Sequence, residues 1–188
     1  MTTHEASPAA PSGPLHIDAI ALPGGGALGL CHLPGRRGVD GRGRAWARDL
    51  DADLDAIAAW KASALLSLVE APEFERLGVP GFADAVKRRP YAWHHVPIPD
   101  MRAPQAESLA AWQRTGSEIV GTLDAGGRVV IHCAAGLGRT GTIAALLLGA
   151  FGIAGDDAIR RVRAARPGTL ETPEQEAFVR EPSDWQLR

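Results

Sequence analysis

Cysteine is scarce in this chain, with only Cys31 and Cys133 among 188 residues. Two cysteines allow at most one intrachain disulfide, which excludes the framework of several bridges that stabilises small secreted domains. We therefore expect both side chains to be free thiols in a reducing compartment.

The chain also has no excess of charge of one sign. Its 20 basic and 22 acidic residues leave a formal net charge of -2, so no overall field attracts nucleic acid or an anionic membrane surface. We expect neither kind of partner. Any anionic ligand must be bound by a local arrangement of groups, and the sequence leaves the oligomeric state open.

Long hydrophobic runs are missing too. The longest extends from Ile143 to Leu148, far below the roughly 20 residues that a membrane-spanning helix requires. Residues 1–14 have neither the basic start nor the apolar centre of a secretory signal. These two absences predict a cytoplasmic protein.

The composition favours one domain behind a short tail. A chain of 188 residues with 45% hydrophobic residues can bury one substantial core and is too short for two average domains. Residues 1–14 contain hardly any large apolar side chain and are predicted to be a flexible tail. Residues 15–188 are then expected to form a single domain.

Strands and helices are predicted to alternate along this domain. Strands are expected at 15–22, with the returning partner LGLCHL at 28–33, and at 64–70, 91–96 and 128–132. Helices are expected from Asp49 or Asp51 to about 63, at 73–77, 82–88, 105–123 and 139–150, from a cap at Asp156 to about 166, and from Thr172 onward; the glycine- and arginine-rich residues 35–43 are expected to form a loop. This order predicts an α/β fold with a central mixed, mostly parallel sheet of about five strands, flanked by helices on both faces.

The segment HCAAGLGRTG, residues 132–141, joins the last predicted strand to an apolar helix. At such a junction successive backbone N–H groups point inward, and the helix dipole adds positive potential. Small residues let the backbone approach a ligand closely, and an arginine at the far end can bind two phosphate oxygens. The predicted phosphate-binding residues are Ala134, Ala135, Gly136, Leu137, Gly138 and Arg139.

Cys133 lies at the base of this loop, where the amides and the Arg139 cation favour the thiolate, the nucleophilic form of cysteine. His132 should face the other side of its strand, so we expect it to shape the loop rather than to donate a proton. Thr140 is a candidate to donate a hydrogen bond to the sulfur and to assist its departure in a second step.

These residues resemble the signature of the protein tyrosine and dual-specificity phosphatase superfamily, which is His-Cys, five residues, and Arg followed by Ser or Thr. LGLCHLPG at 28–35, together with IHCAAGLGRTG, resembles kinase-associated phosphatases, whereas RPGTLETPEQEAF at 166–178 is similar to small atypical dual-specificity phosphatases. The resemblance implies a phosphotyrosine protein phosphatase-like fold. It also implies metal-independent hydrolysis of phosphomonoesters through a cysteinyl-phosphate intermediate, with no cofactor.

A general acid is needed to protonate the leaving oxygen. The resemblance implies an Asp on a mobile loop roughly thirty residues before the nucleophile, and IPDMRAP supplies Asp100 at that separation. A turn after Pro99 is the alternative use of this Asp. The resemblance likewise suggests that Gln175 orders the hydrolytic water, although TPEQ, residues 172–175, is also a capping box.

Other conspicuous residues are expected to be structural. Cys31 is predicted to be a small core residue, and His94 and His95 face opposite sides of a strand, which argues against a shared metal site. The basic clusters at 36–37 and 87–89 are expected to be solvated surfaces.

Several functions remain open at this point. The leading hypothesis is a phosphatase acting on phosphotyrosine, phosphoserine or phosphothreonine in proteins, and the uncharged residues of the loop argue mildly against polyanionic inositol substrates. The alternatives are a phospho-binding docking module with weak turnover, a phosphatase of a small metabolite or lipid phosphate, and thiol chemistry in which Cys31 serves as the resolving cysteine.

Overall fold

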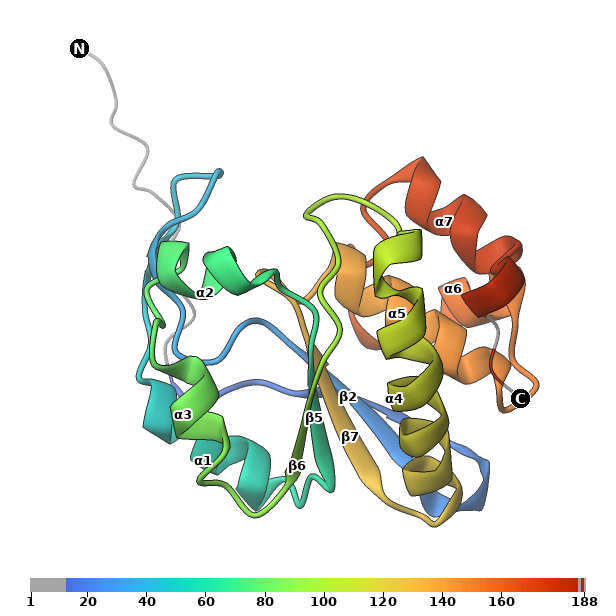
Figure 1. The fold of residues 1–188 in the computed structure, drawn as a ribbon, viewed down its shortest axis with the longest axis horizontal. Helices are drawn as coiled ribbons and strands as arrows, with labels where there is room; N and C mark the ends of the chain where they lie inside the picture. Colours follow the sequence, from blue (N-terminus) through green and yellow to red (C-terminus); the bar gives the residue numbers. More distant parts are fainter. Residues whose placement is uncertain (1–12, 186, 188) are drawn as a thin grey trace.

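A computed structural model of the protein describes residues 13–185 and 187. Five strands form the central sheet in the order β1-β2-β7-β5-β6 (Figure 1). β1 runs antiparallel to β2, and every other neighbouring pair is parallel. The predicted mixed, mostly parallel five-stranded sheet is therefore confirmed; its strands are β1 (Asp18–Ala21), β2 (Ala27–Cys31), β5 (Ala64–Ser67), β6 (Ala92–His95) and β7 (Arg128–His132).

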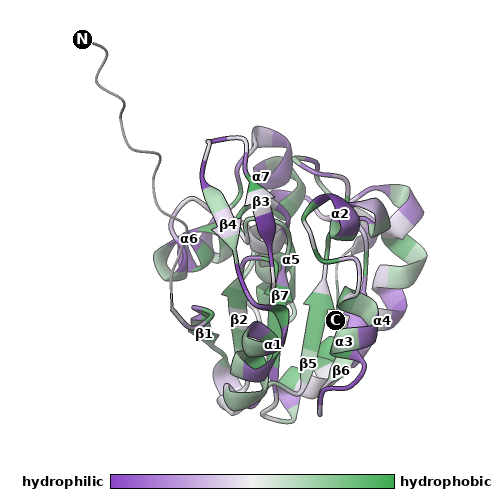
Figure 2. Cartoon of the chain, turned by 90° about the vertical axis from the view of Figure 1, so that its left-hand side faces the viewer, coloured by the Kyte–Doolittle hydropathy of each residue, from purple (hydrophilic) through white to green (hydrophobic). Residues whose placement is uncertain are grey.

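The three inner strands are buried because helices cover both faces of the sheet. All residues of β2 and β5 are buried, and so are residues 129–132 of β7. Apolar runs of this kind, without polar alternation, are typical of strands inside parallel sheets. In Figure 2 these strands form a largely hydrophobic centre.

The helices lie in two groups on opposite faces (Figure 1). α1 to α3 lie on one face, and α4 to α7 on the other, where α5 packs on β2 and β7. The predicted helices are confirmed with small shifts in their ends; they are α1 (Leu50–Ala59), α2 (Ala71–Arg76), α3 (Phe82–Val86), α4 (Ala106–Asp124), α5 (Gly138–Gly149), α6 (Gly155–Ala165) and α7 (Pro173–Arg180), with short 3-10 turns η1 (Pro23–Gly25) and η2 (Ser183–Trp185).

The prediction that residues 35–43 form a loop is wrong in part, because this segment contains a strand. β3 (Arg37–Val39) pairs antiparallel with β4 (Ala45–Ala47) in a separate two-stranded hairpin. One carboxylate holds the turn between them, since Asp40 accepts hydrogen bonds from the backbone N–H groups of Arg42 and Arg44 and from the indole of Trp46. Figure 2 shows the hairpin above the ends of β2 and β7.

The helix caps agree with the sequence at two positions and differ at a third. Asp49 caps α1 by accepting from the N–H of Ala52, and Thr172 caps α7. The predicted cap at Asp156 is wrong, because the N-cap of α6 is Ala154, two residues earlier, and Asp156 lies in the first turn. A carboxylate there still interacts favourably with the helix dipole.

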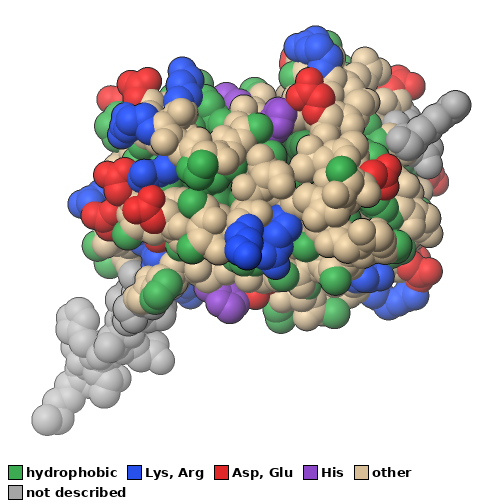
Figure 3. All heavy atoms as spheres, turned by 90° about the horizontal axis from the view of Figure 1, so that it is seen from below, with side chains coloured by type: hydrophobic (Ala, Val, Ile, Leu, Met, Phe, Trp, Pro, Cys, Tyr) green, Lys and Arg blue, Asp and Glu red, His purple; other side chains and the backbone are tan. Residues whose placement is uncertain are grey.

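The surface carries charges of both signs, as the composition indicated. Seen from below in Figure 3, both Lys or Arg and Asp or Glu side chains are present on this face, and uncharged atoms cover most of it. Within the described residues, no helix is long and apolar enough to cross a membrane, and no group of three or more His, Cys, Asp or Glu residues could hold a metal ion. Residues 1–12 of the predicted tail lie outside the described residues.

Candidate active site

The strand register brings the predicted loop to one edge of the sheet. His132, the last residue of β7, is the partner of Cys31 at the end of β2 and of Ser67 at the end of β5. Ligand sites of parallel α/β sheets form at this carboxyl edge. Cys133 follows β7 directly, and α5 begins five residues later at Gly138.

The loop between β7 and α5 curves around the Cys133 sulfur. The N–H of Gly136 points at Cys133 Sγ over 3.3 Å. Gly136 has φ of +73°, and a Cβ atom there would lie 2.2 Å from the carbonyl oxygen of Cys31. Only glycine combines this backbone conformation with so close a neighbour.

Two arginines outside the loop hold its carbonyl groups outward. Arg166 donates to the carbonyl oxygens of Ala135 and Gly136 over 3.0 and 2.6 Å, and Arg36 donates to that of Ala134 over 3.1 Å. In a trans peptide the N–H of the following residue points away from the carbonyl oxygen. The amides of residues 135–137 therefore face the interior of the loop, as predicted.

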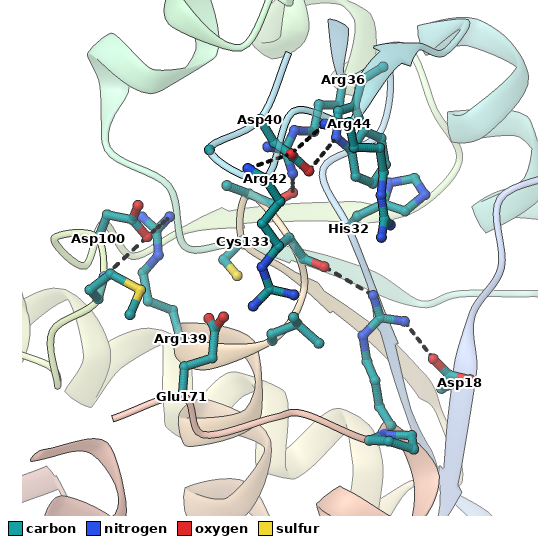
Figure 4. A pocket seen from close by; sticks show the side chains of 18 residues that line it. Asp18, His32, Arg36, Asp40, Arg42, Arg44, Asp100, Cys133, Arg139 and Glu171 are labelled. Atoms are coloured by element: carbon teal, nitrogen blue, oxygen red, sulfur yellow. Dashed lines mark hydrogen bonds and ion pairs between the residues drawn. The ribbon is translucent and has the colours of Figure 1, made fainter. Parts of the chain in front are cut away.

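A cavity of about 620 Å³ opens above this loop (Figure 4). Its lining includes Cys133, Arg139 and Asp100 together with Ala134, Ala135 and Leu137. Gly136 and Gly138 do not line the cavity: the N–H of Gly136 points at Cys133 Sγ, whereas that of Gly138 is donated to Glu171 Oε2, so the structure does not form the phosphate contact predicted for Gly138. The structure thus brings the predicted nucleophile, phosphate-binding arginine and acid into one pocket.

The Arg139 guanidinium is held in place by three oxygen-bearing groups. Its Nη1 donates to Glu73 Oε2 over 2.6 Å and to the carbonyl oxygen of Ile98 over 2.9 Å, and its Nη2 lies 2.8 Å from Asp100 Oδ1. The Arg139 side chain is 1% exposed, against 54% for that of Asp100. The guanidinium is therefore fixed, whereas the carboxylate of Asp100 borders solvent.

Glu73 contacts the site through Arg139, and the sequence predicted it only as part of a helix. Burial opposes its ionisation, but the hydrogen bond from Arg139, that from the N–H of Glu70, and the charges of Arg139 and Arg76 outweigh burial and hold the pKa of Glu73 below its ordinary value. The sequence signal was a carboxylate in a helix that follows a buried strand. Its partner lies 66 residues away, so spacing could not reveal the pair.

Asp100 lies where the chain leaves Pro99, and it also stabilises a turn there. Its Oδ1 accepts from the N–H of Met101 over 3.1 Å, and Met101 has φ of +60°. The two interpretations of this residue are thus compatible, because the turn directs the carboxylate into the pocket.

His132 shapes the loop from beneath, as expected. It is fully buried, its Nε2 lies 2.6 Å from Ser67 Oγ, and its Nδ1 lies 3.2 Å from the carbonyl oxygen of Cys133. Burial lowers the pKa of His132 to about 3. A ring that stays neutral and does not line the cavity is a positioning group.

The hydrogen bond expected from Thr140 to the sulfur is not formed. Thr140 lies in the first turn of α5, and its Oγ1 is buried without a hydrogen-bond partner. The sulfur instead receives the backbone N–H of Gly136.

Gln175 forms the capping box at the start of α7. Its Oε1 accepts from the N–H groups of Glu171 and Thr172, and its Nε2 donates to the carbonyl oxygen of Arg102. The fully buried amide thus links α7 to the loop that carries Asp100. The sequence left two roles open for Gln175, and the structure contains the contacts of the capping role.

Glu171 is a pocket residue that the sequence did not single out. Its Oε2 accepts from the N–H of Gly138 over 2.9 Å, at the N-terminus of α5, where the helix dipole favours a negative charge. Figure 4 shows the carboxylate pointing toward the pocket.

The basic cluster at 36–37 is not the solvated surface that was expected. Arg36 is only 6% exposed and lines the cavity, whereas Arg37 is exposed. Arg36 lies directly before β3, whose three residues are all exposed, and its side chain points inward to donate to the carbonyl oxygen of Ala134. In the other cluster, Arg89 forms ion pairs with Asp51 and Asp55 on α1.

The remaining conspicuous residues are structural, as predicted. Cys31 is fully buried, and burial raises its pKa far above the ordinary thiol value. His94 lies 3.6 Å from Glu118, and His95 contacts the carbonyl oxygen of Val69. The two rings thus have separate partners.

Residues 48–179 match the family model described as Swiss Army Knife protein, DSP-PTPase phosphatase domain. The chain belongs to this phosphatase family. Among curated relatives of this DSP-PTPase, Cyclin-dependent kinase inhibitor 3 of Mus musculus is 30% identical over 156 residues, which cover 82% of this chain and 70% of the relative. The Homo sapiens protein of that name is 28% identical over 174 residues, covering 89% and 78%.

Solved structures agree with this family assignment. Kinase associated phosphatase, solved with its catalytic-site cysteine replaced by serine, aligns with a TM-score of 0.81 and 26% identity over 93% of this chain and 97% of that one. Tk-PTP in its active form aligns with a TM-score of 0.64 and 30% identity, over 87% and 95%. The predicted superfamily, fold and enzyme class are therefore confirmed.

Proposed function

We propose that this DSP-PTPase hydrolyses phosphotyrosine, phosphoserine or phosphothreonine in proteins through a cysteinyl-phosphate intermediate. The observation that carries the proposal is the meeting of Cys133, Arg139 and Asp100 in one cavity. These three groups supply the nucleophile, the oxyanion binder and the acid that such a reaction requires.

In the first step the Cys133 thiolate attacks phosphorus, an S–P bond forms and the ester O–P bond breaks. Arg139 and the inward amides of residues 135–137 bind the oxygens of the transferring group. Asp100, in its protonated form, gives its proton to the leaving oxygen, so that the product departs as a neutral alcohol or phenol.

In the second step a water molecule attacks phosphorus and the S–P bond breaks. Asp100, now a carboxylate, accepts the proton of that water, and the reaction releases inorganic phosphate and the Cys133 thiolate. The sulfur leaves readily because the N–H of Gly136 and the N-terminus of α5 stabilise the thiolate. Arg139 and the amides balance the charge, so the cycle requires no metal.

Glu73 and Gln175 support this chemistry without touching the substrate. Glu73 fixes the plane of the Arg139 guanidinium, and Gln175 fixes the loop that carries Asp100. When the groups that contact the substrate are already held in place, less free energy is needed to reach the reactive geometry. We also propose that residues 15–188 form a single catalytic domain. As the sequence predicts, the proposed location of the protein is the cytoplasm.

A comparison of the wild type with Cys133→Ser tests the function. With a chelator present, the wild type is expected to release phosphate from an aryl phosphate and from phosphopeptides, and Cys133→Ser to release none. Rapid acid quenching should capture a phosphoryl group on the wild-type peptide that contains Cys133. Cys31→Ser is the matched control and should keep its activity, because that thiol lies in the core.

Three outcomes would reject the proposal. Equal turnover by the wild type and Cys133→Ser would exclude the cysteinyl phosphate, and tight phosphopeptide binding without turnover by the wild type would favour the docking module. Loss of activity in Cys31→Ser, together with its recovery under a thiol reductant, would favour thiol chemistry instead.

A further inference from the structure

The β3–β4 hairpin brings three arginines to the wall of the active-site cavity. Arg36, Arg42 and Arg44 all line it, and we call this set the arginine rim. In Figure 4 Arg42 extends from the hairpin into the pocket, toward Cys133 and Glu171. The proposed hydrolysis uses none of the three side chains as a substrate contact.

Carboxylates act on the arginine rim only over distances longer than an ion pair: burial lowers the pKa of Arg36, and the charges of Asp40 and Asp100 offset this in part. Within the part of the chain that the structure describes, none of the three forms an ion pair. Asp40, the nearest acid in sequence, directs its oxygens to the backbone N–H groups of Arg42 and Arg44 and to the Trp46 indole. It therefore holds the shape of the turn rather than the ends of the arginine side chains.

Arg36 is built into this wall. It is 6% exposed, its guanidinium lies 4.4 Å from the centre of the Trp46 ring, and its Nε is buried without a hydrogen-bond partner. Arg44 lies over the same ring at 5.9 Å, and its Nε is likewise unpartnered. The Trp46 ring thus holds both guanidinium groups at the wall of the cavity, so an anionic ligand would meet donors that are already in place.

The other carboxylates of the cavity have partners elsewhere. Asp18 pairs with Arg166 at 2.6 Å, Asp100 pairs with Arg139, and Glu171 accepts from the N–H of Gly138. The positive charge of the arginine rim is thus left facing the space beside the phosphate loop. This charge comes from the hairpin and not from the loop, which explains why the neutral loop sequence gave no sign of it.

We propose that the arginine rim binds a second anionic group of the substrate, beside the phosphate that Arg139 holds. The preferred substrate is then a phosphopeptide in which a glutamate, an aspartate or a second phosphorylated residue neighbours the residue that is dephosphorylated. This inference rests on the proposed function, which identifies the group held by Arg139 as the phosphate of a phosphorylated residue. Arginine forks suit carboxylate and phosphate alike, so either source of negative charge fits.

A peptide fits the surroundings better than a small polyphosphate does. Val39, on the hairpin, is 72% exposed, and Met101, beside Asp100 and lining the cavity, is 49% exposed. Exposed apolar side chains next to a charged site offer contacts to a peptide chain. A sugar or inositol bisphosphate has no apolar surface to match them.

The test measures binding to the Cys133→Ser protein, so that turnover does not consume the ligand. Phosphotyrosine peptides identical except for one neighbour, which is alanine, glutamate or phosphoserine on either side, are titrated by calorimetry. The glutamate and phosphoserine peptides are expected to bind about tenfold more tightly than the alanine peptide. Raising the salt concentration should reduce that preference.

The same titrations on arginine variants assign the preference to its source. Arg42→Gln combined with Arg44→Gln should reduce the preference to less than about twofold. Arg37→Gln is the control, because it removes one arginine charge from the same hairpin outside the cavity, and it should keep the preference. If the double variant loses stability, Arg42→Glu alone replaces it, since Arg42 is exposed and its reversal should make the alanine peptide the better ligand.

Equal affinity for all peptides, or a preference that survives in the double variant, would overturn the inference. Fructose 1,6-bisphosphate serves as the small-molecule arm, and a dependence on Arg42 and Arg44 seen only there would overturn the peptide assignment. Because binding is measured without Cys133, failure of the proposed hydrolysis and failure of the arginine rim give different results.

Discussion

Asp100 Oδ1 lies 2.8 Å from Arg139 Nη2, so the proposed proton donor and the proposed phosphate-binding cation are in direct contact. The contact places the carboxyl group at the edge of the phosphate position, where the leaving oxygen of a bound ester would lie. It also makes the carboxylate and the phosphate competitors for one guanidinium. We therefore expect that binding of the substrate displaces Asp100 from Arg139 toward the leaving group.

Asp100→Asn is expected to lower kcat for phosphopeptides by about 10²- to 10⁴-fold, the range for loss of general acid catalysis. The loss should be much smaller for aryl phosphates with acidic leaving groups, which depart without protonation. The measurement is kcat across a series of aryl phosphates. Asp124→Asn, an exposed carboxylate at the end of α4, is the control, and a leaving-group dependence equal in the two variants would contradict the assigned role.

Glu73→Gln should reduce the free energy of unfolding by about 3 kcal/mol, because it leaves the buried Arg139 guanidinium without its closest counter-charge. Since the pKa of Glu73 is held low in the folded protein, the pair stabilises the fold above the unfolded pKa of about 4.3, and the contribution is lost as the pH falls through the lowered folded value. Urea unfolding at neutral and acidic pH measures both effects.

The control for that substitution is Glu75→Gln, on the exposed side of the same helix, which should leave stability nearly unchanged. A difference between the wild type and Glu73→Gln that stays constant down to pH 3 would show that the charge of Glu73 is not what stabilises the fold.

Protonation of histidines should weaken the fold in mild acid. Burial lowers the pKa of His132 to about 3 and that of His32 to about 4, whereas an unfolded histidine has a value of about 6.5. Below about pH 6.5 the unfolded chain binds protons that the folded chain does not, so stability falls, for His132 until about pH 3, at up to about 1.4 kcal/mol per pH unit for each histidine.

Urea unfolding between pH 7.5 and pH 4.5 checks this prediction. His132→Asn should flatten the pH dependence, whereas His16→Gln, which replaces an exposed ring, should follow the wild type. A wild-type unfolding free energy that is constant over this range would contradict it.

Gln175→Ala should lower stability by about 1–2 kcal/mol through loss of the cap at α7. Thr172→Ala removes the other half of the capping box and should have a similar effect on stability. If the Gln175 side chain acts only through the contacts of the capping box, neither variant should accumulate the phosphoenzyme in rapid-quench experiments. Accumulation in Gln175→Ala alone would show that this side chain orders the hydrolytic water.

Gly136→Ala should abolish phosphate binding, because the added methyl group would meet the carbonyl oxygen of Cys31 and the backbone has a positive φ. Gly149→Ala, in α5 with open space around it, is the control and should be neutral or slightly stabilising. Binding of inorganic phosphate or of an oxyanion inhibitor measures the difference. A Gly136→Ala protein with normal affinity would contradict the need for a tightly curved loop.

The local part of this protein was predictable from its sequence. Residues 132–141 contain the strand end, the small loop residues, the cysteine and the arginine in one continuous segment, so their chemistry depends on short-range geometry. The helices and inner strands were predictable for the same reason, since apolar periodicity and caps such as Asp49 and Thr172 act within a few residues.

The tertiary structure alone decided which distant residues meet that segment. Glu73 reaches Arg139 across 66 positions, Arg36 reaches the carbonyl of Ala134 across 98, and Arg166 joins the loop to Asp18 across 148. Such contacts depend on the order of strands in the sheet and on the inward direction of the Arg36 side chain. Sequence spacing carries no record of either, because ion pairs and hydrogen bonds respond to distances in space and not to separation along the chain.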